Sequence, residues 1–276
     1  MGRRTWMAIA ALPLLAAGFG VIAHAGGKLL SRELARAFGQ AQAEPGVACG
    51  LDPPPNAPDF AAYQARRRHE MAARGYELVC DADLDRYDIP WKRRPLSAAR
   101  LAFEPIDLAH TSFAALEHKG NQVETIGDTR SRLYRRFGLP DGRIVVLSEH
   151  DMSADHSHRW RDPNDEPERI GKLPARLVVL QTTSGRAVSD LTWMEGRRDY
   201  ELWVDANAGV DRALRARMFA LAASLPPSKP ACPNEAPYKA VPFGPDGFPQ
   251  EEPLPASMTE AEMQALTERI EHPPCK

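Results

Sequence analysis

The chain has 276 residues, with 35 lysines and arginines against 37 aspartates and glutamates, and is therefore close to neutral. This balance gives no general attraction to nucleic acid phosphates or anionic lipids, so it argues against a nucleic-acid-binding protein. With 43% hydrophobic residues, the chain is long enough for one large or two small domains with a core of their own.

Residues 1–25 have the pattern of an export signal. Arg3 and Arg4 precede an apolar run from Trp6 to Ile22, and Ala23 and Ala25 supply the small side chains that a signal peptidase accepts. We therefore expect cleavage after Ala25 and a periplasmic protein. The run of about 17 residues is at the lower limit for crossing a bilayer, so an uncleaved anchor in the inner membrane is the alternative.

All four cysteines follow this signal, and an even number of cysteines in an oxidising compartment favours disulfide bonds. Pairing of chain neighbours predicts Cys49 with Cys80 and Cys232 with Cys275, because each bridge then closes one segment that prolines interrupt. Loop-closure entropy predicts a stabilisation of about 3 to 4 kcal/mol for each bridge. The spacing matches neither a redox-active Cys-x-x-Cys motif nor a typical zinc site.

The first predicted unit is a small helix and strand module at residues 26–95. Apolar residues at helical spacing predict helices over about 28–42 and 59–74, and a proline-rich connector separates them. The run "YELVCD" at 76–81 predicts a strand. We expect the bridge between Cys49 and Cys80 to staple this module.

Residues 96–225 are predicted to form an antiparallel sheet with a helix on one face, which is an α+β fold. Glycine-containing turns separate alternating strand patterns, as in a meander of hairpins. The predicted strands are "SFAALEH" (112–118), "SRLYRRFGL" (131–139), "RIVVLSEH" (143–150), "RLVVLQTT" (176–183), "AVSDLTWM" (187–194) and "RDYELWVD" (198–205). The turns lie at 119–121, 140–142, 184–186 and 195–196.

A helix over residues 209–225 is predicted to cover the sheet. Its apolar side comprises Val210, Leu214, Met218, Leu221 and Leu225. Residues 226–276 then hold twelve of the 25 prolines and predict an irregular arm. A short helix closes this arm, where Thr259 and Glu262 form a capping box.

A connection of about 25 residues after the third predicted strand gathers the candidate metal ligands, His150, Asp155, His156 and His158. Imidazole and carboxylate groups bind zinc or copper, and in extended backbone His156 and His158 would point the same way and could clamp one ion. The residue order matches neither the metallo-β-lactamase nor the His-Glu-x-x-His motif. We therefore interpret the segment as a solvated polar loop without a cofactor, with a zinc or copper site as the alternative.

Two further patterns have a ligand-binding interpretation. Asp81–Asp88 spaces its carboxylates as a calcium loop does, but it lacks the glycine and the final glutamate of that loop, so we expect an acidic turn. Trp193, Tyr200 and Trp203 lie on neighbouring predicted strands, where aromatic residues more commonly form core or cross-strand pairs than a ligand face. No motif for a catalytic nucleophile is present.

Export, a predicted sheet and no catalytic motif favour a non-enzymatic module of the bacterial cell envelope that binds another envelope protein, as regulators and immunity proteins do. The segment "LTWMEGRRDYELWV" with the following helix resembles the closing segment of several exported regulatory or envelope-associated domains, which favours a binding sheet. The alternative is a metal-binding protein or metal-dependent hydrolase centred on His150, His156 and His158. Imidazole rings that converge on a concave surface would favour that alternative.

Overall fold

A computed structural model describes residues 60–88, 100–159, 161–229, 231–232, 237, 239–244, 249–250 and 259–271. The predicted export signal and the helix expected over residues 28–42 lie outside this part of the chain. Within it, no helix is both long and apolar enough to cross a membrane. Cys80 and Cys232 are buried and neither is free, but the predicted pairings stay predictions because Cys49 and Cys275 lie outside the described residues.

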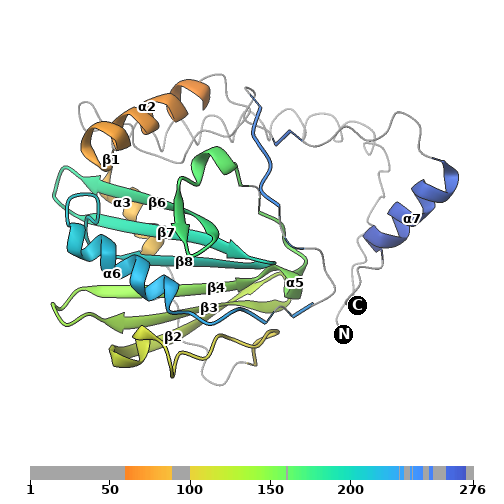
Figure 1. The fold of residues 1–276 in the computed structure, drawn as a ribbon, viewed down its shortest axis with the longest axis horizontal. Helices are drawn as coiled ribbons and strands as arrows, with labels where there is room; N and C mark the ends of the chain where they lie inside the picture. Colours follow the sequence, from red (N-terminus) through yellow and green to blue (C-terminus); the bar gives the residue numbers. More distant parts are fainter. Residues whose placement is uncertain are drawn as a thin grey trace, which may run out of the picture.

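The described residues form a mixed α+β fold around one eight-stranded, mostly antiparallel sheet (Figure 1). The predicted fold class is confirmed at this level. The strands are β1 (Glu77–Val79), β2 (Glu117–Ile126), β3 (Thr129–Gly138), β4 (Ile144–Asp151), β5 (Glu168–Ile170), β6 (Leu173–Thr182), β7 (Ala187–Glu195) and β8 (Arg198–Val204). The helices are α2 (Phe60–Arg74), α3 (Asp81–Leu84), α5 (Met152–Asp155), α6 (Arg212–Ala223) and α7 (Glu260–Glu271), with 3-10 helices at Asp85–Tyr87, Ser112–Ala115 and Pro163–Asp165.

The strand order is β1-β6-β7-β8-β4-β3-β2, with β5 paired to β6 outside this path. Strands β2 to β4 and β6 to β8 form two antiparallel groups, which meet where β4 pairs with β8. Strand β1 pairs in parallel with β6, so the predicted N-terminal module contributes a strand to the central sheet. Helix α2 lies by this β1 edge (Figure 1).

The strand predicted over residues 112–118 is wrong. Thr111 caps a 3-10 helix by accepting a hydrogen bond from the Phe113 amide, and the Phe113 side chain is then only 1% exposed. Strand β2 begins at Glu117 and continues through the predicted turn at 119–121, where a register shift lies between His118 and Gly120. A bulge of this kind absorbs the glycine without ending the strand.

Helix α6 packs on one face of the sheet, which we call the first face (Figure 1). The Leu214, Met218 and Leu221 side chains are buried there among apolar residues of the strands. Val210 is 67% exposed, so it does not extend this apolar stripe as predicted. The reason is that the helix begins only at Arg212, with Asp211 accepting a hydrogen bond from the Leu214 amide.

A buried ion network closes one end of the first face. The guanidinium of Arg198, which is 0% exposed, lies 3.3 Å from a Glu149 carboxylate oxygen and 2.8 Å from one of Asp151. It also donates hydrogen bonds to the carbonyl oxygens of Glu104 and Lys229. Arg198 therefore joins two irregular segments to the sheet.

The opposite side of the sheet, which we call the second face, is apolar around α3. Because side chains alternate along a strand, Leu202 of β8 points to the first face and Trp203 to the second. Leu84 and Tyr87, from α3 and the 3-10 helix after it, are buried against this apolar area. The strand residues in the same cluster are Val79, Tyr134, Val146, Leu180, Val188 and Trp203.

Helix α7 begins as its capping box predicts. The Thr259 amide donates to a Glu262 carboxylate oxygen over 2.8 Å, and the Glu262 amide donates to the Thr259 hydroxyl over 3.3 Å. These reciprocal bonds satisfy two backbone donors that the first helical turn leaves open.

Candidate functional site

Polar and charged side chains on the second face lie in two cross-strand rows, and Tyr134 of the second row also belongs to the apolar area. The antiparallel register places every second residue of neighbouring strands opposite one another on the same face. The first row comprises Glu124, Arg132, His150 and Asp199, and the second comprises Tyr134, Ser148, Glu201, Thr192 and Arg176. Because α6 packs on the first face, the second face is the polar side of the sheet. We take the second face as the candidate functional site.

Both ring nitrogens of His150 are engaged in hydrogen bonds. Nδ1 lies 3.1 Å from Arg132, and Nε2 lies 2.8 Å from Asp155 and 3.2 Å from the Ser157 hydroxyl. Because a guanidinium only donates, Nδ1 must accept, so in the neutral ring Nε2 carries the proton and donates to Asp155. Neither nitrogen is then a free base for Ser157 or a free metal ligand.

Asp155 is held in its charged form by this network. Burial alone would raise the pKa of Asp155, but hydrogen bonds from His150, Ser131 and Ser157 lower the pKa well below its usual range. The carboxylate is therefore an acceptor for three neighbouring donors. It orders the loop that follows β4.

His156 and His158 do not take the arrangement predicted for a metal clamp. Both side chains are exposed, and His156 has a left-handed backbone with φ 57° at the end of α5, so the extended backbone assumed for residues 156–158 is wrong. In the described part of the chain, no group of three or more His, Cys, Asp or Glu side chains is placed to hold a metal ion. Zinc or copper binding by His150, Asp155, His156 and His158 stays a hypothesis for solution experiments.

Two carboxylates of the second face pair with Arg159, and a third, Asp190, is close enough for its charge to interact with Arg159. The Arg159 guanidinium lies 2.9 Å from a Glu201 oxygen and also pairs with Asp199. Burial, and next the nearby charge of Glu201, raise the pKa of Asp190 to about 7. One Asp190 oxygen accepts a hydrogen bond from the Tyr87 hydroxyl over 3.2 Å, and the other is buried without a hydrogen bond.

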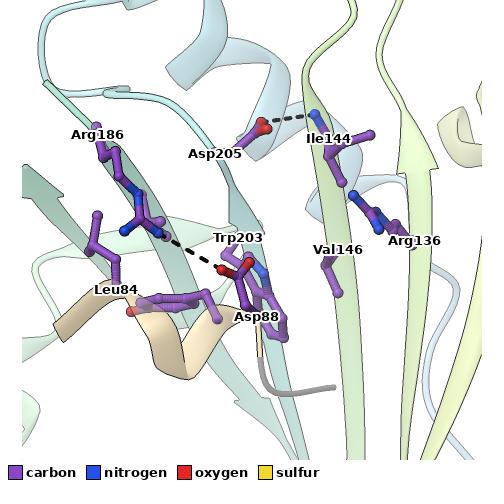
Figure 2. A pocket seen from close by; sticks show the side chains of 11 residues that line it. Leu84, Asp88, Arg136, Ile144, Val146, Arg186, Trp203 and Asp205 are labelled. Atoms are coloured by element: carbon purple, nitrogen blue, oxygen red, sulfur yellow. Dashed lines mark hydrogen bonds and ion pairs between the residues drawn. The ribbon is translucent and has the colours of Figure 1, made fainter. Parts of the chain in front are cut away.

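A cleft of about 190 Å³ opens beside α3 on the second face (Figure 2). Trp203, Val146 and Val188 form its apolar base, since these side chains belong to the buried cluster under α3. Arg186 points toward Asp88, 3.8 Å away, so that a weak ion pair lies at the cleft (Figure 2). The other lining residues are Leu84, Tyr87, Arg136, Ile144, Ala187 and Asp205.

The aromatic residues singled out in the sequence do not share a face. Trp193 and Tyr200 stack with ring centroids 5.0 Å apart in the buried core of the first face. Trp203 points to the second face, where it makes edge contacts with Tyr87 and Tyr134. The expectation of core and cross-strand pairs therefore holds for Trp193 and Tyr200.

The acidic segment after β1 is a capped turn. One Asp83 carboxylate oxygen accepts a hydrogen bond from the Cys80 amide over 2.9 Å, and one Asp81 oxygen accepts from the Ser184 hydroxyl over 2.8 Å. Hydrogen bonding to Ser184 lowers the pKa of Asp81, against a smaller effect of burial. These aspartates therefore fix α3 over the sheet.

Sequence reasoning did not find the cleft. The one available signal is the alternation of side chains along β8, which puts Glu201 and Trp203 on the same face. The order of the strands, which brings α3 and Arg186 to that face, is not visible in a single sequence. In comparisons with known proteins, no family model, curated protein or solved structure matches the chain.

Proposed function

We propose that the chain is an exported, non-enzymatic module that binds another protein of the bacterial cell envelope, of the regulatory or immunity type, through the second face of its sheet. The cleft beside α3 is the observation that carries this proposal. At about 190 Å³ it is smaller than the roughly 300 to 1,000 Å³ of small-molecule sites, and it suits one inserted side chain. An apolar base within a charged rim is the arrangement around anchor residues of protein interfaces.

The asymmetry of the sheet supports the second face as the binding surface. Helix α6 fills the first face, where the buried cluster is almost entirely apolar. On the second face, Arg132 contacts Glu124 and His150, and Arg159 contacts Asp199 and Glu201. Side chains held in this way lose little conformational entropy when a partner covers them, which favours association.

The alternative proposal is a metal-binding protein or a metal-dependent hydrolase. It needs His150 as a ligand, but both ring nitrogens of His150 already have hydrogen-bond partners. The exposed rings of His156 and His158 lie in a loop outside the cleft. The geometry of the described residues therefore favours the protein-binding module.

Affinity capture from envelope extracts tests the proposal, with the mature chain, residues 26–276, as bait. The test variant is Ile144→Lys, since Ile144 lines the cleft and is half-buried, and a lysine stem retains much of its packing while adding a charge. The control is Val210→Lys, at an exposed aliphatic residue that does not line the cleft.

Wild type and the Val210 variant are expected to capture the same protein, and the Ile144 variant is expected to bind it at least about tenfold more weakly. Circular dichroism and thermal melts establish that each variant is folded. A folded Ile144 variant with unchanged affinity, or no specific capture by wild type, would reject the proposal.

A further inference from the structure

We infer that Arg176 on β6 is the docking point for a carboxylate side chain of the partner protein. This inference rests on the proposed function and adds the chemistry of the partner: it presents an aspartate or glutamate to the second face. The assignment starts from an arginine whose charge the surrounding structure leaves uncompensated.

Arg176 differs from the arginines around it. Arg67 lies 2.8 Å from Glu77, Arg132 contacts Glu124, and Arg159 contacts Glu201. Across the part of the chain that the structure describes, the Arg176 guanidinium has no hydrogen bond or ion pair, and only longer-range charge interactions act on it. A guanidinium stays charged at physiological pH, so Arg176 is an unpaired cation on this face.

The surroundings of Arg176 make the free energy of its charged guanidinium less favourable. The residue is half-buried on β6, opposite the buried Thr192 of β7. Burial, followed by the positive charge of Arg67, lowers the pKa of Arg176. Removing a charged group from water is unfavourable unless an opposite charge compensates for it.

The charged groups that face Arg176 do not neutralise it. Arg67 and Arg159 are positive, and Asp165 and Asp190 oppose them from the loop and from β7. Arg67 already pairs with Glu77, and Arg159 pairs with Asp199 and Glu201. Asp165 and Asp190 are therefore the acids left to act on Arg176, and neither makes an ion pair with it. Because the pKa of Asp190 is raised to about 7, this side chain is only partly ionised at neutral pH and compensates the charge of Arg176 less.

A carboxylate is the anion that matches both the positive charge of Arg176 and a protein partner at the proposed interface. The planar fork of a guanidinium binds a carboxylate through two parallel hydrogen bonds, which fixes the orientation as well as the charge. Arg176 and Leu180 point to the same face, and four residues of strand separate them by about 13 Å. Leu180 pairs with Val188, which lines the cleft, so one partner surface can reach the cleft and Arg176 together.

A titration with small anions tests the site without a partner. The side-chain Nε–Hε resonance of Arg176 is assigned with an Arg176→Gln variant, and the mature protein is titrated with sodium acetate at constant ionic strength in chloride. Sodium phosphate is titrated in parallel. We expect saturable acetate binding at millimolar concentrations that Arg176→Gln weakens at least about tenfold. The matched control, Arg212→Gln at an exposed position of α6, should bind acetate as wild type does.

A second measurement uses the protein captured by the mature chain. The Arg176→Glu variant should bind it at least about 30-fold more weakly, because it sets a carboxylate against a carboxylate, whereas Arg212→Glu should bind it unchanged.

The remaining outcomes test the assignment separately from the proposed function. Acetate shifts that do not saturate, or equal affinity in Arg176→Gln, would overturn it, and saturation by phosphate alone would exclude a carboxylate as the ligand. Failure of protein capture with intact acetate binding would reject the proposed function but keep the anion site. An Arg176→Glu variant that binds the captured protein normally would remove Arg176 from the interface.

Discussion

Asp190 shows how strongly the neighbours of one residue set its chemistry. In the sequence it is one acid within a predicted strand, with nothing to distinguish it. In the structure, burial and the nearby Glu201 raise its pKa from 3.8 to about 7. The folded protein therefore holds a proton on Asp190 over a pH range in which the unfolded chain has lost it.

This shift predicts that folding stability falls as pH rises from about 4 to about 7. Over that range the folded state binds more protons at Asp190 than the unfolded state does, so the free energy of unfolding decreases with pH and then levels off above pH 7. Urea denaturation at pH 5 and pH 8 measures the slope. Asp190→Asn should flatten it by on the order of 1 kcal/mol per pH unit between pH 5 and pH 7.

Tyr87→Phe is the matched control for this prediction, because it removes the hydrogen bond to Asp190 and keeps the carboxylate. The free energy of unfolding should still decrease between pH 5 and pH 8 in that variant. Equal slopes in wild type and Asp190→Asn would show that Asp190 does not titrate as argued.

A second prediction at this scale concerns the histidine loop. We expect wild type to bind zinc or copper weakly or not at all at neutral pH, because His156 and His158 are exposed and the ring nitrogens of His150 are engaged. Calorimetric titration compares wild type with the double variant His156→Ala/His158→Ala. A tight one-to-one isotherm that the double variant erases would place the metal-binding alternative first.

At the scale of secondary-structure elements, side chains of the sheet hold the irregular segments in position. The Arg198 side chain contacts Glu149 and Asp151 of β4 and donates to the carbonyl oxygens of Glu104 and Lys229. The Ile106 amide donates to the same Glu149 carboxylate. One guanidinium thus fixes two described segments, at Glu104 and at Lys229, that lie outside the strands and α-helices.

Arg198→Ala should therefore destabilise the fold by about 3 to 5 kcal/mol, because it leaves the buried Asp151 without its cation and the buried Glu149 with Arg135 alone. Chemical denaturation measures the loss. Arg212→Ala, at an exposed position of α6, serves as the control and should change stability by less than about 0.5 kcal/mol. A loss below about 1 kcal/mol for Arg198→Ala would mean that the network contributes little net stability.

Elements that depend on local residues could be predicted, and those that depend on distant contacts could not. The turns at 140–142, 184–186 and 195–196 are confirmed, and their glycines have positive φ as hairpin turns require. The error at residues 112–118 has its cause in a buried Phe113, whose contacts come from other strands. The parallel pairing of β1 with β6 links residues about one hundred positions apart, which hydrophobic alternation does not specify.

The same distinction applies to the candidate site. Alternation along β8 correctly separates Tyr200 from Trp203, because that period is a local property of a strand. Whether Arg176 has a partner depends on side chains from α2, β7 and two loops, so the lack of an ion pair among the described residues becomes visible only in three dimensions. The exposed, left-handed His156 is likewise a result of where α5 ends.

At the scale of the whole molecule, the predicted disulfide bonds determine where the terminal segments attach to the sheet. Non-reducing peptide mapping of the mature protein should find Cys49 joined to Cys80 and Cys232 joined to Cys275, with both links lost in a reduced digest. Cys80 directly precedes α3, so the first bridge would attach the N-terminal segment beside the cleft. A link between Cys80 and Cys275 would instead join the two ends of the chain.

The pairing of β1 with β6 also sets the order in which this protein can assemble. If the proposed export takes place from the N-terminus, Glu77–Val79 reaches the far side of the membrane about one hundred residues before Leu180–Thr182, the segment that β1 pairs with. Until then β1 and α3 have no sheet to join, and closing so long a loop carries an entropic cost that slows their docking. The wall of the cleft is therefore completed late. From the time that β6 forms until β1 docks, the edge of β6 is open to pairing with other chains.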